Sequence, residues 1–366
     1  MPYHQKRTGF WNYFLVILVS GLLLAGYGGW MAPSHWGAVP ALMVLAYPVV
    51  ATVALVMGLV WLLTRRWRLA VVMLAAVLAT WPSLRSNFPV NFSNHDVDSS
   101  ACFTVLSYNV AAFEDSLWTD TSRMHPVMQQ ILDIDADLVV MIQPETYGKP
   151  YDKRKSIQPW TQDLEQHYRY RTRSSHDGVE FLSKYPFSHK PLSMPECSLE
   201  YFPYLIRAIN RYAFDVNMNG KQLRVIGAYM TSFQLDDDQR RVLDTTNYAM
   251  RTLPGLYRRL DRAFTLREHA AKDLRDSLDA SPANVILCTD LNDVPQSYAW
   301  RTILGDDLHD AYGECHTGYA NTFNAHHMLF HIDHILYRGN LRAVAFERLP
   351  LSGSDHYPII ARFVWQ

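Results

Sequence analysis

The chain has 366 residues, of which 49% are hydrophobic and 13% aromatic, and a formal net charge of −1 at pH 7. This much apolar material can fill a core, which excludes a chain that is disordered throughout. Of the 34 basic residues, five precede residue 69, so the rest of the chain carries 29 basic against 35 acidic residues, a net charge of −6. That balance argues against a simple basic nucleic-acid-binding module, which usually has a surplus of Lys and Arg.

Long apolar runs open the chain. No Asp, Glu, Lys or Arg occurs in residues 8–63, and the runs at about 10–30 and 39–63 are each long enough to cross a bilayer. A third run, at about 67–83, is shorter and crosses only with little tilt. A buried hairpin of a soluble protein is a poor alternative, because charge-free runs of this length are rare in soluble chains, and no small-residue cleavage site follows the first run. We therefore expect residues 1–84 to form a membrane anchor of about three helices.

Most positive charges near these runs lie on one side of them. Lys6 and Arg7 precede the first run and three arginines lie in residues 65–68, whereas the loop 31–36 has neither Lys nor Arg. Because positive loops stay in the cytoplasm, three spans would place the remainder of the chain outside. The sequence therefore predicts an integral protein of the inner (plasma) membrane whose main domain is extracytoplasmic, on the periplasmic side. If the third run does not cross, that domain is cytoplasmic.

A change of composition separates the anchor from the domain that follows. Residues 85–100 are rich in Asn, Ser and Asp and have little periodicity, which is typical of a linker. Fully extended, such a segment would reach about 50 Å. We expect residues 101–366 to form the folded domain. The four cysteines in the chain are widely spaced, which excludes a Cys-based zinc site.

The domain alternates strand-like and helical patterns. Strand-like runs are at 103–109, 137–142, 178–182, 212–216, 223–229, 284–288, 332–337 and 358–364. Helical patterns are at 125–134, within 237–278 and near 297–304. Strands arriving singly and in pairs, with helices between them, predict an α/β domain in which a two-layered sheet core is faced by helices. The arginines of 237–278 are interspersed with acids, and we expect them on a solvated helix face.

Polar side chains follow several of the predicted strands, where they would gather on one edge of the sheets. Asn109 closes the first strand and Glu145 follows the second. Asp290 and Asn292 stand at alternate positions, so in an extended segment both share one face. A single Glu with carboxamide neighbours is typical of a site for Mg²⁺, with Mn²⁺ as an alternative, because these hard ions keep several waters and accept phosphate oxygens.

A second acidic cluster, Ser354-Asp355-His356, lies near the C-terminus. His356 could act as a cationic donor to phosphate or as a proton acceptor, and Asp355 or another acid could fix its tautomer. Together with Asp290 and Asn292, this pair is equipped to activate water against a phosphate ester.

In this order the residues resemble the endonuclease/exonuclease/phosphatase superfamily, which includes deoxyribonucleases, abasic-site endonucleases, neutral sphingomyelinases and inositol-polyphosphate phosphatases. The chain is similar to a membrane-anchored, bacterial-type member. The matching motifs are Leu106-Ser-Tyr-Asn109-Val, Ile142-Gln-Pro-Glu145, Gly178-Val-Glu-Phe-Leu-Ser183-Lys-Tyr-Pro186, Thr289-Asp290-Leu-Asn292-Asp293, Ile332-Asp333-His334-Ile335-Leu336 and Ser354-Asp355-His356-Tyr-Pro358. They span about residues 101–366.

The resemblance implies a four-layered α/β sandwich, two packed β-sheets flanked by helices, with a metal-dependent site at one end. It implies metal contacts at Glu145, Asn109 and Asp355. It assigns the attacking water to Asp290, and the phosphate to Asn292 and to an Asp355–His356 pair.

The sequence departs from the family pattern at Thr289, where the acidic motif of the family usually begins with Gly, and at Tyr229. Tyr229 stands where many members have a His, although the abasic-endonuclease-like branch has a Tyr there, so the resemblance implies a phenol donor to phosphate. Asn109, Asn292 and Tyr229 would then bind the substrate. Asp333 often supports the site in this family after an Arg-Ile pair, but here Phe330 and His331 precede Ile332-Asp333, which makes its place in the site less secure.

These expectations combine into a membrane-anchored, Mg²⁺-dependent phosphoesterase that is nuclease-like and uses water as the nucleophile. The substrate is a phosphoester, in nucleic acid or in a lipid head group, and no protein partner is predicted. One alternative is a phospholipid or sphingolipid phosphodiesterase, which the anchor and the acidic domain favour. The other is a catalytically silent binding or scaffold protein of the same fold.

Overall fold

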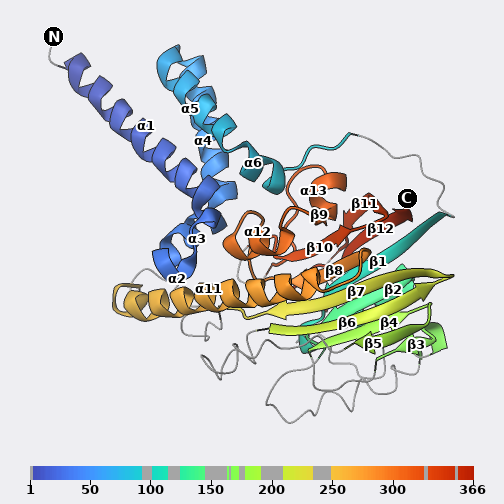
Figure 1. Ribbon diagram of the computed structural model, residues 1–366. Helices are drawn as coiled ribbons and strands as arrows, with labels where there is room; N and C mark the ends of the chain where they lie inside the picture. The colour runs from blue at the N-terminus through green and yellow to red at the C-terminus, as the bar shows by residue number, and fades with distance from the viewer. Residues whose placement is uncertain are drawn as a thin grey trace.

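The computed structural model describes residues 3–92, 101–113, 124–144, 163–164, 166–172, 178–190, 209–233, 249–324, 329–350 and 353–366. Within these ranges a bundle of N-terminal helices projects from a domain built on two β-sheets (Figure 1). The bundle lies within or just beyond residues 1–84, and the sheets lie within residues 101–366.

The N-terminal helices form an antiparallel bundle. They are α1 (Tyr3–Tyr27), η1 (Gly28–Trp30), α2 (Pro33–Trp36), α3 (Ala38–Leu45), α4 (Tyr47–Leu63), α5 (Trp67–Ala79) and α6 (Trp81–Asn87). By length and composition, Gly9–Trp30 can cross a membrane alone. Up to three spans result if α3–α4 and α5–α6, which bend by 60° and 70° at their breaks, each count as one.

The bundle is apolar inside and outside. Tyr47, Trp61 and Met73 are buried between the helices. Val49 and Leu78 illustrate the outward surface, where their exposed fractions are 67% and 64%. A helix bundle that leaves large aliphatic side chains uncovered on its outer face is typical of a bilayer environment, where lipid covers them.

Each sheet contains six strands within the described residues. The first has the order β11-β12-β1-β2-β4-β3. Its strands are β1 (Cys102–Asn109), β2 (Leu138–Ile142), β3 (Tyr170–Arg171), β4 (Val179–Ser183), β11 (Leu341–Arg348) and β12 (Ile359–Trp365). The second has the order β5-β6-β7-β8-β10-β9. Its strands are β5 (Phe187–Lys190), β6 (Ile209–Met218), β7 (Lys221–Met230), β8 (Val285–Asp290), β9 (His309–Asp310) and β10 (Asp333–Arg338).

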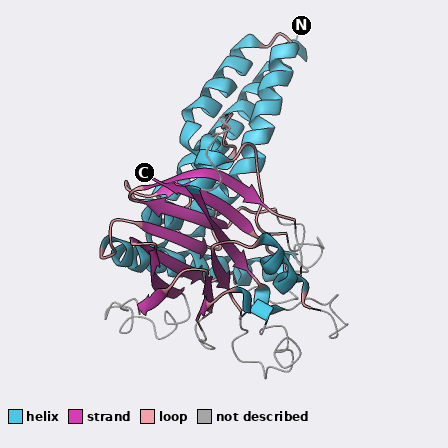
Figure 2. Cartoon of the chain, turned by 90° about the vertical axis from the view of Figure 1, so that its right-hand side faces the viewer, coloured by secondary structure: helices cyan, strands magenta, loops and turns pink. Residues whose placement is uncertain are grey.

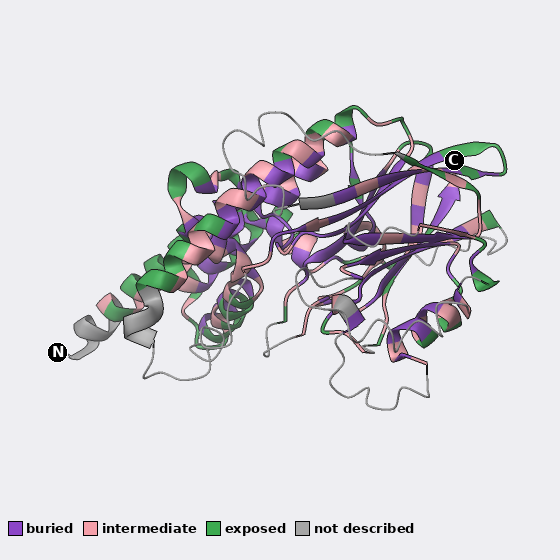
Figure 3. Cartoon of the chain, turned by 90° about the horizontal axis from the view of Figure 1, so that it is seen from below, coloured by how far each residue is buried: buried purple, intermediate pink, exposed green. Residues whose placement is uncertain are grey.

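Helices cover the outer faces of both sheets. They are α7 (Pro126–Ile134), α11 (Ala249–Asp279) and α12 (Tyr298–Leu304), whereas α13 (Ala311–Cys315) contributes Ala311 and Tyr312 to the apolar cluster between the sheets. The residues between the sheets form one apolar cluster, a second lies between the first sheet and α7, and a third lies between the second sheet and α11 with α12. Figures 2 and 3 show the stacked sheets and the buried inner strands. The predicted four-layered sandwich of two packed sheets is thus confirmed.

Parallel pairs lie at the centre of each sheet and determine where polar residues gather. β1 pairs with β2, and β7 pairs with β8, both in parallel. Because parallel strands end at the same edge, Asn109, Tyr229 and Asp290 emerge at one edge of the sandwich. The strands at whose ends these residues lie are buried along almost their whole length. In β8 every residue is buried.

The segment expected to be a linker begins inside the fold. Helix α6 extends to Asn87, and the Tyr312 hydroxyl donates to the Asn87 carbonyl at 2.9 Å. Asn91 Nδ2 donates to the carbonyl oxygens of Gly313 and His316 at 3.1 and 2.7 Å. Residues 88–92 therefore lie against the sandwich, while 93–100 lie outside the described residues.

Candidate active site

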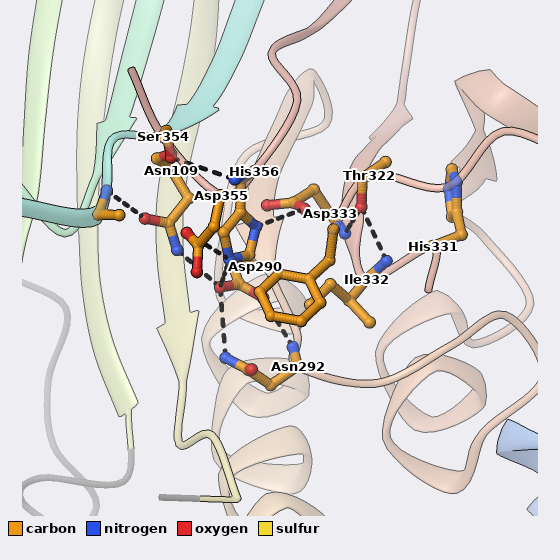
Figure 4. Close-up of polar contacts among 12 residues, drawn as sticks. Asn109, Asp290, Asn292, Thr322, His331, Ile332, Asp333, Ser354, Asp355 and His356 are labelled. Carbon is orange, nitrogen blue, oxygen red and sulfur yellow. Dashed lines mark hydrogen bonds and ion pairs between the residues drawn. The ribbon is translucent and has the colours of Figure 1, made fainter. Parts of the chain in front are cut away.

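Asn109 connects the two sheets at the edge where β1 and β8 end. Its Nδ2 donates to Oδ2 of Asp290 at 2.8 Å and to Oε1 of Gln143 at 3.0 Å. Its Oδ1 accepts the backbone N–H of Ala111 at 2.9 Å, which fixes the orientation of the amide. The side chain is buried, and Figure 4 shows it directed at Asp290. One sheet thereby orients a carboxylate of the other.

Asp290 is buried, and the loop that follows it supplies most of its other hydrogen bonds. The backbone N–H of Asn292 donates to Oδ1 at 2.8 Å, and Asn292 Nδ2 lies 3.3 Å from Oδ2. Asn292 has a φ of 50°, a left-handed conformation that Asn tolerates better than most residues. Burial, with the nearby Asp333 carboxylate, raises the pKa of Asp290 to about 7. This carboxylate can therefore accept a proton near neutral pH.

His356 stands between two acids. Its Nδ1 donates to Oδ2 of Asp333 at 2.9 Å, and its Nε2 lies 3.9 Å from Oδ2 of Asp290 (Figure 4). Burial alone would lower the pKa of His356, but the Asp333 and Asp290 carboxylates outweigh it and raise the pKa to about 10. The imidazole is therefore cationic at neutral pH and points one nitrogen toward Asp290.

The backbone around Asp333 and His356 is held by hydroxyl groups. Thr322 Oγ1 accepts the N–H groups of Ile332 and Asp333, both at 2.9 Å. Ser354 Oγ accepts the N–H of His356 at 3.1 Å and donates to the Asn109 carbonyl at 2.7 Å. Asp333 also pairs directly with Asp290 in the β8–β10 ladder. The His356–Asp333 pair is thus fixed from both sides.

Asp355 does not form a hydrogen bond with His356, although it precedes that residue in the sequence. Its side chain is 45% exposed, and its Oδ1 lies 4.0 Å from Nε2 of His356. The acid that fixes the His356 tautomer is Asp333. Asp355 is instead more exposed than Asp290 or Asp333, so its carboxylate can meet a cation or a substrate.

Tyr229 lies beside Asp290, since the two residues are paired in the β7–β8 ladder. Burial, followed by the charge of Asp290, raises the pKa of Tyr229 to about 12, and hydrogen bonds with Ser232 and Asn292 limit the shift. The phenol therefore keeps its proton at neutral pH and can act as a donor.

The donor set fits a hard divalent cation. Oxygen or nitrogen atoms of Asp290, Asp333 and His356 all lie within 4.8 Å of one another. Among the described residues Asp333 is already engaged by His356, so Asp290 and the exposed Asp355 are the carboxylates left to face an ion, while Asn109 turns Nδ2 toward Asp290 and Oδ1 toward the N–H of Ala111. Carboxylate and carboxamide oxygens are the ligands that Mg²⁺ prefers. Glu145, expected to be the main metal ligand, lies outside the described residues.

Most of these residues could be predicted from the sequence, but some of their hydrogen-bond partners could not. The roles of Thr322 and Gln143 had no signal in the sequence beyond Gln143 lying two positions before Glu145. Asp333 had a signal, the Ile332-Asp333 motif after an apolar segment, but the missing Arg reduced its weight. The antiparallel pairing of β8 with β10 brings Asp333 opposite Asp290, and the sequence alone does not show this pairing.

Comparisons with known families agree with this arrangement. A family model described as the endonuclease/exonuclease/phosphatase family matches residues 106–356, more than half of the chain. A second model, described as a domain of unknown function, matches residues 9–87. A search of curated proteins gave no match.

Solved structures of low identity also align with the chain. The human Nocturnin catalytic domain with bound sulfate is 14% identical, with a TM-score of 0.45, and the alignment covers 74% of this chain and 97% of that one. D. rerio TDP2 complexed with single-strand DNA product is 15% identical, with a TM-score of 0.48 and coverage of 73% and 99%. A Staphylococcus aureus beta toxin variant with bound magnesium ions is 16% identical, with a TM-score of 0.46 and coverage of 70% and 98%.

The assignment rests on the matched family model and on the two packed sheets with their shared polar edge. Members of the family are metal-dependent hydrolases of phosphoester bonds, and the buried Asp290 beside the His356–Asp333 pair supplies acid–base groups for such a reaction. The chain belongs to the endonuclease/exonuclease/phosphatase family and is an enzyme of that class.

Proposed function

We propose that this protein is a membrane-anchored, Mg²⁺-dependent, nuclease-like phosphoesterase that hydrolyses phosphodiester or phosphomonoester bonds by direct attack of water. One observation carries the proposal. Asn109 at the end of β1 and His356 in the segment before β12, both in the part of the chain that forms the first sheet, converge on Asp290 of the second sheet. A proton acceptor (Asp290), an amide (Asn109) and a cation (His356) therefore surround one point. Transfer of a phosphoryl group to water uses groups of these kinds.

Asp290 would accept the proton of the attacking water. The water oxygen forms a new bond to phosphorus, the bond from phosphorus to the leaving oxygen breaks, and the leaving oxygen takes a proton from solvent. His356 would face the developing negative charge with Nε2, since Nδ1 is already given to Asp333. Asn292 and Tyr229 would add neutral donors to the phosphoryl oxygens.

Mg²⁺ would be held by Glu145, Asn109 and Asp355, and when bound it neutralises charge on the phosphoryl oxygens. Asp355 offers a carboxylate 4.0 Å from Nε2 of His356, Asn109 offers its Oδ1, which also accepts the N–H of Ala111, and Glu145 follows β2 in the sequence. Mn²⁺ would satisfy the same oxygen ligands.

The anchor would place the catalytic domain outside the inner membrane. The N-terminus and the turn between α4 and α5, which carries Arg65 and Arg66, lie at the end of the bundle far from the sandwich (Figure 1). Trp36 and Trp81 are 63% and 53% exposed at the end near the sandwich. Positive residues at one end and exposed Trp residues at the other are consistent with a bundle that crosses the bilayer, with its charged end in the cytoplasm.

A lipid phosphodiester is a second candidate substrate, favoured by where the anchor touches the domain. Val44 of α3 packs against Val294 and Ile332, which flank the catalytic residues. The site therefore lies at the edge of the sandwich on which the membrane helices sit, close to lipid head groups. The acidic balance of the domain favours this candidate over a duplex nucleic acid.

The substrate classes can be separated with full-length protein in lipid nanodiscs. Duplex DNA, single-stranded DNA, a nitrophenyl phosphodiester and vesicles containing phospholipid or sphingomyelin would be supplied with Mg²⁺ or with a chelator. A phosphodiesterase cleaves at least one of them, and the chelator abolishes the cleavage. DNA cleavage that falls steeply with salt would identify a nuclease, and vesicle cleavage alone would identify the lipid enzyme.

The assignment of roles has its own test. Asp290→Ala and His356→Ala should each abolish turnover of whichever substrate is cleaved. Wild-type turnover in either variant would overturn the roles proposed for these side chains. Absence of both Mg²⁺ binding and turnover in the wild-type protein would favour a catalytically silent scaffold.

A further inference from the structure

Arg267 in the middle of α11 is fully buried, although the arginines of this segment were expected on a solvated face. Its guanidinium lies over the rings of Phe233 and Phe264, at 4.4 and 4.5 Å from their centroids. Such a contact is favourable for a cation, but burying a charge is costly unless polar partners meet it. For Arg267 the expectation of a solvated position is wrong, because the guanidinium is buried against the rings of Phe233 and Phe264.

Those polar partners belong to the loop that carries the catalytic residues. Arg267 Nη1 donates to the backbone carbonyl of Asn292, and Nε lies 4.0 Å from Oδ2 of Asp293. Arg267 thus holds Asn292 by its backbone carbonyl. Asn292 in turn orients Asp290 through its own backbone N–H and its side-chain amide. The Arg267 side chain has an exposed fraction of zero, so it cannot contact a substrate. Its guanidinium can affect the position of Asp290 through Asn292.

The N-terminal helices cover the other side of this arrangement. Ala38 and Ala41 of α3 pack against Phe264, one of the two rings over Arg267. The residue after Arg267, Glu268, accepts the backbone N–H of Ser34 at 2.9 Å and its hydroxyl at 3.0 Å. Two adjacent residues of α11 thus face the anchor and the catalytic loop.

A second contact joins η1 directly to the end of the same loop. A Cβ on Gly29 would lie 1.8 Å from the backbone carbonyl oxygen of Gln296, so glycine is required for this close approach. Next to it, the Arg301 guanidinium lies 3.3 Å from the centroid of the Trp30 ring. We call the area where Gly29, Ser34, Ala38, Ala41 and Val44 meet the domain the docking surface.

We propose that Arg267 is a positioning residue for the catalytic loop 290–296, and that the N-terminal helices, packed at the docking surface, keep it in place. The anchor then supports the active site in addition to holding the protein at the membrane. This inference rests on the proposed function for its catalytic readout, but the loop geometry can be measured without any turnover.

The first test replaces Arg267 in the full-length protein in nanodiscs. Arg267→Met keeps the apolar packing and removes the donor, and Arg267→Lys keeps the charge but not the planar group. With a nitrophenyl phosphodiester, kcat should fall about 100-fold in Arg267→Met, with KM changed by less than about threefold, because a misplaced loop costs catalysis more than binding. Arg267→Lys should recover only part of that loss. Arg258→Met, at an exposed arginine of the same helix, is the matched control and should retain wild-type kcat.

The second test perturbs the docking surface by one methyl group. Gly29→Ala should force η1 away from Gln296, whereas Gly9→Ala adds the same methyl where no atom lies within 4 Å. Hydrogen exchange of backbone amides in 290–296 should become at least about tenfold faster in Gly29→Ala and in Arg267→Met, and should stay unchanged in Gly9→Ala. A lower kcat should accompany the faster exchange in Gly29→Ala.

The results separate this inference from the proposed function. If the wild-type protein cleaves no phosphoester, the proposed function fails, and amide exchange in the loop still tests Arg267 and the docking surface. Unchanged exchange and kcat in Arg267→Met, or in Gly29→Ala, would overturn the inference. If Arg267→Met does not fold, Arg267→Lys and Gly29→Ala provide the same two readouts.

Discussion

The bundle and the sandwich bury different kinds of side chain. In the bundle the interior is apolar and aromatic, as at Trp61 and Met73, and the exposed outer surface is also apolar. In the sandwich the polar residues Asn109, Asp290 and Asp333 are buried together at one edge. A carboxylate is buried only where other groups meet it, so the contrast separates a bundle held together by apolar packing from the edge of the sandwich where acid–base groups gather.

The largest effect is expected at the buried carboxylate of Asp290. Asp290→Asn keeps the shape and removes the proton acceptor, and kcat should fall about 1,000-fold. Because burial and Asp333 disfavour the charge of Asp290 in the folded protein, the same variant should unfold at an equal or higher temperature. Steady-state kinetics and thermal unfolding measure the two quantities, with the exposed Asp306→Asn as control. Parallel losses of activity and stability would mean that Asp290 is structural.

The next effect distinguishes the two acids near His356. Asp333→Asn keeps an oxygen that can accept the hydrogen bond from Nδ1 but removes the negative charge that favours the imidazolium, and kcat should fall about 100-fold because the imidazole loses its charge. Asp355→Asn leaves that bond intact and should mainly weaken Mg²⁺ binding. Kinetics over a range of Mg²⁺ concentrations separate these outcomes. A larger kcat loss in Asp355→Asn than in Asp333→Asn would contradict the pairing observed here.

A smaller, reversible effect should follow pH. Activity should rise as Asp290 loses its proton, with a midpoint at or below about 7, because a bound cation lowers that pKa further. It should fall again as His356 loses its proton near pH 10. The raised pKa also means that His356 contributes stability that is fully present below its ordinary pKa of about 6.5 and is lost as pH rises through about 10.

The pH dependence can be checked with kcat/KM profiles and with thermal unfolding of the same samples. The His356→Gln variant should lose the alkaline decline in stability. A rate that does not vary between about pH 5 and pH 9 would mean that Asp290 is not the titrating base.

The smallest effect on activity is expected in the bundle. Trp61 of α4 is buried against Trp11 and Phe14 of α1, with ring centroids at 6.1 and 6.4 Å, and is not among the residues of the docking surface. Trp61→Leu should lower the free energy of unfolding of the bundle by about 1–3 kcal/mol and leave kcat within about twofold of wild type. Unfolding in detergent and kinetics in nanodiscs measure the two. A large loss of kcat would show that the division between the two regions is less sharp than their interiors suggest.

The sequence predicts the fold well because local patterns determine its strands. Apolar runs such as 284–288 and 358–364 lie within one or two residues of β8 and β12. β11 escaped prediction, because its residues alternate weakly and its pairing with β12 shifts register at Ala343 and Ala345. The site is harder, since the Asp333–His356 bond and the burial of Arg267 depend on which elements lie side by side.

The most direct test of the central claim follows the oxygen atom of water. Full-length protein in nanodiscs would hydrolyse a nitrophenyl phosphodiester in ¹⁸O-labelled water with Mg²⁺, beside Asp290→Asn, and the products would be analysed by mass spectrometry. Water attack at phosphorus predicts one ¹⁸O in the phosphoryl product, none in the nitrophenol, and about 1,000-fold less labelled product in Asp290→Asn. Label in the alcohol, or an undiminished rate in Asp290→Asn, would contradict the account.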